Sequence, residues 1–192
     1  MAGRQAKVLA PAQLDMVLDH VKGRRDALRC RVIVLLSFRA ALRACEIAGV
    51  EWSMVLDSSG NVGHILELEN RVAKKGSGRR IPIHPELRAA LKALLRRTPK
   101  PVGPVIRSRK GGHLRPNSIV NWFVKLFAEL EILGASSHSG RRTAITSWAR
   151  SLPEAGGSLV DVMQLAGHKG LLTTQGYVAG SSTAQRKLVS LL

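Results

Sequence analysis

The stretch HILELENRVAKKGSGRRIPIH, residues 64–84, decides the fold class of a chain that otherwise has helical character. Apolar and polar residues alternate in HILELE (64–69), which is typical of a strand with one buried face. The turn-rich segment KKGSGRR (74–80) follows, and RRIPIH (79–84) has the composition of another strand. A second turn-rich segment, DSSGN (57–61), precedes them. We therefore predict a small antiparallel sheet of about three strands.

Apolar residues at helical spacing lie on both sides of this sheet. One helix should close at or near Gly49, because glycine tolerates a left-handed cap. We expect helices at the following places: from Pro11, over Val32–Ala41, up to Gly49, from Pro85, from Pro116, at about 139–151 and at about 158–166. The predicted fold class is mainly α with a small inserted three-stranded antiparallel sheet (α+β).

Composition narrows the functional class. The 192 residues include 30 Lys and Arg against 13 Asp and Glu, a net charge of +17, which indicates a polyanionic partner, with nucleic acid first. No apolar run is long enough to span a membrane, and MAGRQAKVLAPAQ lacks the apolar core of a signal peptide. Cys30 and Cys45 have no metal-ligand spacing, so we expect both to be reduced and buried. These features suit one cytoplasmic domain.

The segment HSGRRT, residues 138–143, holds a histidine and an arginine one helical turn apart. A helix beginning here would present His138 and Arg141 on one face. Each of these groups disfavours charge on the other, whereas an anion between them would accept hydrogen bonds from both. By itself the spacing is also typical of an exposed polar helix face, and both interpretations stay open.

Two further segments offer cations that could serve a site. Arg43 precedes Glu46 by one turn, so it is either a snorkelling, paired arginine or a guanidinium that Glu46 holds in a cleft. Lys74 and Lys75 lie in a turn, where lysines are usually solvated but can also reach a DNA groove. There a lysine could donate a proton to a leaving oxygen.

The segment GHKGLLTTQGY, residues 167–177, ends on the only tyrosine of the chain. His168 follows a glycine turn, and Tyr177 lies nine residues further on. From this fragment alone, Tyr177 is either a packed core residue or a nucleophile.

The order of these segments is more specific than any one of them. The chain reads L-R-x-x-E, then a lysine near a glycine turn before R-x-I-P, then H-x-x-R-R-T, then G-H-x8-Y. This order resembles the catalytic domain of the tyrosine recombinases, the phage integrase family, from about Val8 to Tyr177. Connecting segments such as IPIHPELRAAL and GGSLVDVMQLAGH are similar as well. Ser139 and Gly140 replace the family's usual acidic-leucine pair, and Ala166 replaces a leucine.

The resemblance implies a role for each matching residue. Arg43 and Arg141 are the two catalytic arginines, His138 and His168 the two histidines, and Tyr177 the nucleophile. Ungapped counting from R-x-I-P favours Lys74 as the catalytic lysine, with Lys75 as the alternative. Glu46 supports Arg43. The resemblance also implies a 3′-phosphotyrosyl DNA intermediate that forms without metal or any other cofactor.

The same resemblance sets the expected partners and boundaries. The partner is double-stranded DNA with a specific recombination site, and the protein should form a tetramer on DNA in a prokaryotic or phage setting. DNA contacts are expected from Lys75, Arg79, Arg80, Arg107, Arg109, Lys110, Arg115 and Arg142. We expect residues 1–192 to be one catalytic domain with a core at about 8–177 and a tail helix at about 178–192, without the family's N-terminal domain. The alternatives are a type IB topoisomerase-like enzyme and a catalytically idle DNA-binding regulator.

Overall fold

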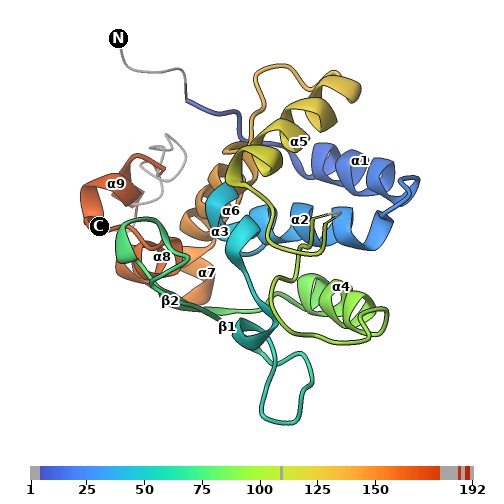
Figure 1. Cartoon of the computed structure of the whole chain (residues 1–192). Coiled ribbons are helices and arrows are strands. Elements are labelled where there is room, and N and C mark those ends of the chain that lie inside the picture. The colour runs from blue at the N-terminus through green and yellow to red at the C-terminus, as the bar shows by residue number, and fades with distance from the viewer. Residues whose placement is uncertain (1–4, 109, 178–185, 187–188, 191–192) are drawn as a thin grey trace.

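The computed structural model describes residues 5–108, 110–177, 186 and 189–190, and within them it is mainly helical. The α-helices are α1 (Pro11–Lys22), α2 (Ala27–Phe38), α3 (Ala44–Gly49), α4 (Pro85–Leu95), α5 (Pro116–Glu129), α6 (Ser139–Arg150), α7 (Leu152–Ala155), α8 (Leu159–Ala166) and α9 (Leu171–Gln175), with short 3-10 helices η1 (Trp52–Met54) and η2 (Lys74–Gly76). Figure 1 shows α1, α2 and α5 on one side of the molecule, α8 and α9 on the other, and α3 and α6 between them.

The sheet has two strands among the described residues, where three were expected. Strand β1 (Ile65–Leu68) pairs antiparallel with β2 (Arg79–Pro82). The segment 57–61 forms a tight turn instead of leading into a third strand, and its ends meet in a single bridge between Leu56 and Val62. The Asp57 carboxylate accepts hydrogen bonds from the backbone of Ser59 and Asn61, which stabilises this turn locally.

The main hydrophobic core surrounds α2, whose residues from Val32 to Leu36 are fully buried. Helices α1 and α4 pack against α2 and contribute residues to this core. Helix α6 also packs against α2. The predicted helix over Val32–Ala41 ends earlier than expected, at Phe38. Ala41 adopts a left-handed φ of 51°, which turns the chain towards α3.

Gly49 ends α3 as predicted, but for a different reason. Its φ is not left-handed, and the cap residue is Val50. A Cβ atom at Gly49 would lie 2.6 Å from Cγ1 of Val72, so glycine is needed there for space. The predicted reason, a left-handed cap, was therefore wrong.

A second, smaller apolar cluster connects α6 and α8 and carries the candidate site. Its buried members are Ala41, Ala144, Ile145, Val162 and Ala166, and Tyr177 packs at its edge. Helix α6 reaches α2 closely because position 140 is glycine: a Cβ atom there would lie 2.2 Å from Oγ of Ser37. Gly140 therefore allows α6 to lie close to α2.

The two cysteines are free, and they differ in burial. Cys30 is buried in α2, as predicted, whereas Cys45 in α3 is only half-buried. No helix among residues 5–108 and 110–177 is long and apolar enough to cross a membrane.

Candidate active site

The residues proposed for chemistry come from distant parts of the chain and meet around one hollow. This hollow, of about 250 Å³, is lined by Ala6, Arg43, His138, Arg141, Arg142, His168, Thr173 and Tyr177. A neighbouring hollow shares Arg43, His168 and Thr173 with it and adds Lys74 and Lys75. The two hollows therefore form adjoining parts of one cationic site.

Arg43 lies at the N-terminus of α3 and is held by Glu46. The backbone N–H of Arg43 donates to Oε2 of Glu46 at 2.9 Å, and its Nη1 donates to Oε1 at 2.7 Å. Arg79 donates to the same two oxygens from the other side, Nη1 to Oε1 at 3.2 Å and Nη2 to Oε2 at 3.1 Å. One fully buried carboxylate thus orients two guanidinium groups.

The Glu46 carboxylate stays ionised despite its burial. Burial acts to raise its pKa, but the hydrogen bonds and charges of Arg79 and Arg43 outweigh this effect and hold the pKa below its usual value. Removing one positive partner would leave a buried charge with fewer contacts. Glu46 is therefore a structural anchor of the site, not a proton donor to it.

Arg141 is almost fully buried in the first turn of α6, with 4% of its surface exposed. Its Nη1 donates to the backbone carbonyl of Ala41 at 2.6 Å, and its Nη2 donates to that of Ala166 at 2.7 Å. Burial, followed by the neighbouring charge of Arg43, lowers the pKa of Arg141 to about 10, so the group remains charged at neutral pH. Two carbonyls thus hold a cation at the base of the hollow.

His138 precedes α6 and opens onto the site. The backbone N–H of Ser136 donates to Oγ of Ser139 at 2.9 Å, which fixes the turn into the helix. Much of the His138 surface is exposed, but partial burial of the ring, followed by the charges of Arg141, Lys74 and Arg43, lowers its pKa. The imidazole is therefore neutral at pH 7 and is free to accept a proton.

His168 and Tyr177 form the opposite wall of the hollow. Their rings stack with centroids 5.5 Å apart and an angle of 26°. Nδ1 of His168 shares a hydrogen bond of 2.9 Å with Oγ1 of Thr174, and Thr174 is fully buried. Burial, followed by the charges of Arg141, Arg43 and Arg79, lowers the pKa of His168 to about 4. Like His138, this ring is neutral at pH 7.

The ring of Tyr177 also has a cation beside it. Cζ of Arg142 lies 5.9 Å from the ring centre, within the range of a cation–π contact. Arg142 was expected to contact DNA, and the structure places it in the wall of the hollow next to Tyr177.

The two lysines lie side by side in η2, at the edge of the site. Both are exposed and line the hollow that Arg43 and His168 share. The charge of Lys74 contributes to lowering the pKa of His138, which places its ammonium group within electrostatic reach of that ring. Lys75 adopts a left-handed φ of 58°. Both lysines line this hollow, and Lys75 stays the alternative to Lys74.

The other basic residues expected to contact DNA differ in exposure and in whether their side chains already have a hydrogen-bonding partner. Arg80, Arg107, Lys110 and Arg115 are exposed. Two of them are occupied: Arg80 pairs with Glu67 at 3.2 Å, and Nη2 of Arg107 donates to the backbone carbonyls of Lys100 and Val102. Arg109 lies outside the described residues.

Arg79 departs from its expected role as a DNA contact. Its side chain is 6% exposed, and it donates to Glu46 and to the backbone carbonyl of Leu165. Strand alternation is the signal that would have found this burial, because Arg79 lies two residues before the buried Ile81 on the same face of β2. The prediction for Arg79 is corrected accordingly: it supports the site from within.

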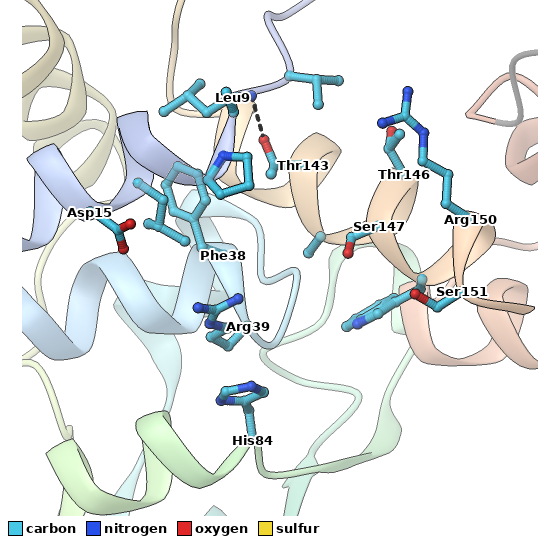
Figure 2. A pocket seen from close by; sticks show the side chains of 16 residues that line it. Leu9, Asp15, Phe38, Arg39, His84, Thr143, Thr146, Ser147, Arg150 and Ser151 are labelled. Carbon is cyan, nitrogen blue, oxygen red and sulfur yellow. Dashed lines mark hydrogen bonds between the residues drawn. The ribbon is translucent and has the colours of Figure 1, made fainter. Parts of the chain in front are cut away.

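Another hollow lies away from the candidate active site. It has a volume of about 410 Å³ and shares no lining residue with the candidate active site. Figure 2 shows Arg39, His84 and Arg150 around it, with the backbone N–H of Leu9 donating to Thr143. Among the described residues, no three His, Cys, Asp or Glu side chains are grouped as ligands for a metal ion.

Comparisons with known proteins identify the family of the chain. The phage integrase family profile matches residues 7–183. Tyrosine recombinase XerC of Actinobacillus succinogenes is 32% identical over 174 residues, which cover 86% of this chain and 54% of that protein. The chain thus spans about half the length of the curated relatives it matches.

Solved structures show the same fold at low sequence identity. The Tn1549 transposon integrase, in complex with circular intermediate DNA, has a TM-score of 0.77 and 16% identity over 100% of this chain and 67% of that one. XerA recombinase has a TM-score of 0.72 and 19% identity over 96% of this chain and 64% of its own. Because the family profile matches nearly all of its residues, and because its tyrosine lines a hollow with several cationic side chains, the chain belongs to the phage integrase family.

Proposed function

We propose that this chain is the catalytic part of a site-specific DNA recombinase. One observation carries the proposal: Tyr177, the only tyrosine, lines a hollow together with two arginines and two histidines. A tyrosine has an ordinary pKa of about 10 and attacks phosphorus poorly unless its surroundings favour the phenolate. The cations of this hollow supply such surroundings.

Arg43 and Arg141 would bind the scissile phosphate. Both reach the hollow from fixed positions, and both are charged at neutral pH. Glu46 accepts from Nη1 of Arg43 and also from Arg79, and the second cation offsets the negative charge that Glu46 would present to an incoming phosphate. The guanidinium groups would stabilise the negative charge that grows on the non-bridging oxygens in the transition state.

Residues of this chain can supply the nucleophile, the proton acceptor and the proton donor of the cleavage step. Oη of Tyr177 attacks phosphorus while His138 or His168 accepts the phenolic proton. The bond from phosphorus to the 5′ oxygen breaks, and Lys74 gives a proton to that oxygen. The product is a 3′-phosphotyrosyl bond, which keeps the energy of the phosphodiester, so a second 5′ hydroxyl can reverse the attack.

Phosphate binding would also tune the histidines. In the empty site, neighbouring positive charges help to lower the pKa of both rings. A bound phosphodiester anion opposes those charges and raises the pKa of each ring. His138 and His168 would therefore become better proton acceptors when DNA is in place.

Duplex DNA is the partner that the charge favours. The chain carries a net charge of +17, and Arg107, Lys110 and Arg115 are exposed. We expect DNA affinity to fall steeply as salt rises. The Tn1549 integrase, which has the same fold, is known in complex with DNA, and this supports the choice. We therefore expect the protein to act in the cytoplasm, at the nucleoid.

The number of chains needed for recombination follows from the number of strands that must be cleaved. Exchange of strands between two duplexes requires four cleavages, and each chain offers one tyrosine. We therefore expect four chains in the complete reaction. A topoisomerase-like enzyme needs only one chain, and an idle DNA-binding protein needs none of the six catalytic side chains.

Trapping the covalent intermediate tests the proposal. The substrates are nicked duplexes with randomised cores, in which cleavage releases a short strand and cannot reverse. After denaturation, wild-type protein should carry covalently bound DNA, and Tyr177→Phe should carry none. An adduct that persists in Tyr177→Phe would refute the assignment, and no adduct with either protein would favour the idle DNA-binding protein.

Two further assays separate the remaining alternatives. Sequencing of the trapped DNA should show a preferred core, and joining of strands from two duplexes should occur. Relaxation of supercoiled plasmid without such joining would favour the topoisomerase-like enzyme instead.

A further inference from the structure

We propose that Arg79 is a positioning residue that holds Arg43 and the turn before His168 in one fixed arrangement. Arg79 was not among the residues expected to serve catalysis. The inference deepens the function proposed above and rests on it. It is argued from the burial of the Arg79 side chain and from its hydrogen bonds to three different segments of the chain.

The first observation is the set of hydrogen bonds that Arg79 donates. Two go to the two oxygens of Glu46 in α3, at 3.2 and 3.1 Å. One goes from Nε to the carbonyl of Leu165 in α8, at 2.8 Å, and one from Nη1 to that of Ser77, at 3.3 Å. A single side chain thus ties together α3, α8 and the turn that carries the two lysines.

The second observation concerns Arg43. Each oxygen of Glu46 accepts one hydrogen bond from Arg43 and one from the fork of Arg79. A planar fork fixes the plane of a carboxylate, which a single ammonium group cannot do. The orientation of Glu46 sets that of the Arg43 guanidinium, and Arg79 therefore acts on Arg43 through Glu46.

The third observation concerns the turn that leads into His168. Gly167 has a left-handed φ of 62°, and a Cβ atom at this position would lie 2.8 Å from Nη1 of Arg79. The turn therefore lies directly against the guanidinium, next to the carbonyl of Leu165 that Arg79 binds. Loss of Arg79 would remove both the contact and the hydrogen bond that place His168.

The charge of Arg79 supports the same conclusion. Burial, followed by the charges of Arg141, Arg43 and Arg79, lowers the pKa of His168. The groups that face or surround His168 are Arg43, Arg141, Arg79, Thr174, Tyr177 and, at the edge of the shared hollow, Lys74, Lys75 and Lys169. Because Arg79 is buried, its charge reaches this ring with little screening by solvent.

Two variants of Arg79 separate positioning from simple loss of stability. Arg79→Gln removes the charge and half of the fork, while Arg79→Lys keeps the charge and loses the fork. The matched control is Arg88→Gln, because Arg88 is also partly buried and donates to backbone carbonyls, those of Val62 and Gly63, away from the candidate site. Melting temperatures of all variants set an assay temperature at which each is folded.

The first measurement is an NMR titration of the histidines in the full chain without DNA, with His168 assigned from the spectrum of His168→Gln. In Arg79→Gln, we expect the pKa of His168 to rise modestly above its wild-type value of about 4, because burial and the charges of Arg141 and Arg43, which lower it more, remain. In Arg79→Lys and Arg88→Gln it should stay near the wild-type value. An unchanged pKa in Arg79→Gln would overturn the link between Arg79 and His168.

The second measurement is the rate of adduct formation at saturating nicked duplex. We expect Arg79→Gln and Arg79→Lys to lose about tenfold or more in rate, because small misplacements of reacting groups cost that much. DNA affinity should change little, because Arg79 is buried. Arg88→Gln should keep the wild-type rate. If Arg79→Gln is unfolded, Arg79→Lys carries the test, and a wild-type rate in Arg79→Lys would overturn the positioning role.

Failure of the proposed function would look different. If the wild-type chain forms no adduct on any duplex, the recombinase assignment fails for every variant alike. The shift of the His168 pKa in Arg79→Gln requires no DNA and would still report that Arg79 acts on His168.

Discussion

Oγ1 of Thr174 and Nδ1 of His168 share a hydrogen bond of 2.9 Å, although the two residues lie six positions apart in the chain. Thr174 is fully buried in α9, one turn before Tyr177. The bond therefore links the placement of the His168 ring to the helix that ends beside the nucleophile.

Thr174→Val should weaken catalysis more than DNA binding. Valine keeps the shape of threonine and removes the hydroxyl, so His168 loses the partner that orients its ring. We expect about 1 kcal/mol lower stability and a roughly tenfold slower cleavage rate. Chemical denaturation and adduct formation at saturating DNA check both values. Thr174→Ser, which keeps the hydroxyl, should remain close to wild type in rate, and an equal loss in both variants would argue against this role.

Glu46→Gln should be among the most destabilising single changes in the chain. The fully buried carboxylate neutralises Arg43 and Arg79, and its loss leaves two guanidinium groups without their counter-charge. We expect a decrease in the free energy of unfolding of about 3–5 kcal/mol, measured by urea denaturation. Glu67→Gln is the control, because its pair with Arg80 is exposed and worth at most about 1 kcal/mol. Similar effects of both changes would contradict the assigned role of Glu46.

Acid should destabilise the protein partly through His168. The pKa of this ring is about 4 in the folded chain and about 6.5 when unfolded, so the unfolded state binds more protons between these pH values. Stability contributed by His168 therefore falls as pH decreases from 6.5 to 4, by at most about 3 kcal/mol. Glu46 acts in the same direction at lower pH, because its folded pKa is lowered.

Urea denaturation at several values between pH 7 and pH 4 measures this dependence. His168→Gln lacks the titrating ring, and its stability should decline less steeply over this range than that of the wild type. Parallel slopes in the two proteins would show that His168 is not the group responsible.

Gly140→Ala should destabilise the contact between α6 and α2. The new Cβ atom would lie 2.2 Å from Oγ of Ser37 and 2.7 Å from Cδ2 of Phe38, so both helices would have to move. Overpacking of this kind costs about 1–3 kcal/mol, which thermal unfolding detects. Gly112→Ala provides the comparison, since no atom lies within 4 Å of a Cβ there. A stability of Gly140→Ala equal to that of Gly112→Ala would refute the close approach.

Sequence alone determined the helices and the identity of the candidate site residues. Periodic apolar residues and the prolines at positions 11, 85 and 116 predicted α1, α4 and α5 at their observed starts, because both signals are local. The order of the motifs selected Arg43, His138, Arg141, His168 and Tyr177, and the structure brings all five around one hollow.

Only the tertiary structure decided which partners the basic and polar side chains around the site have. Strand alternation in β2 indicates that Arg79 and not Arg80 faces inward, but only the tertiary structure shows what Arg79 binds there, namely Glu46 of α3 and the carbonyl of Leu165 in α8. Thr174 belongs to no motif, and its role follows from how α9 folds back onto the turn at His168. Such choices depend on contacts between segments far apart in the chain, and burial changes the cost of a charge more than residue type does.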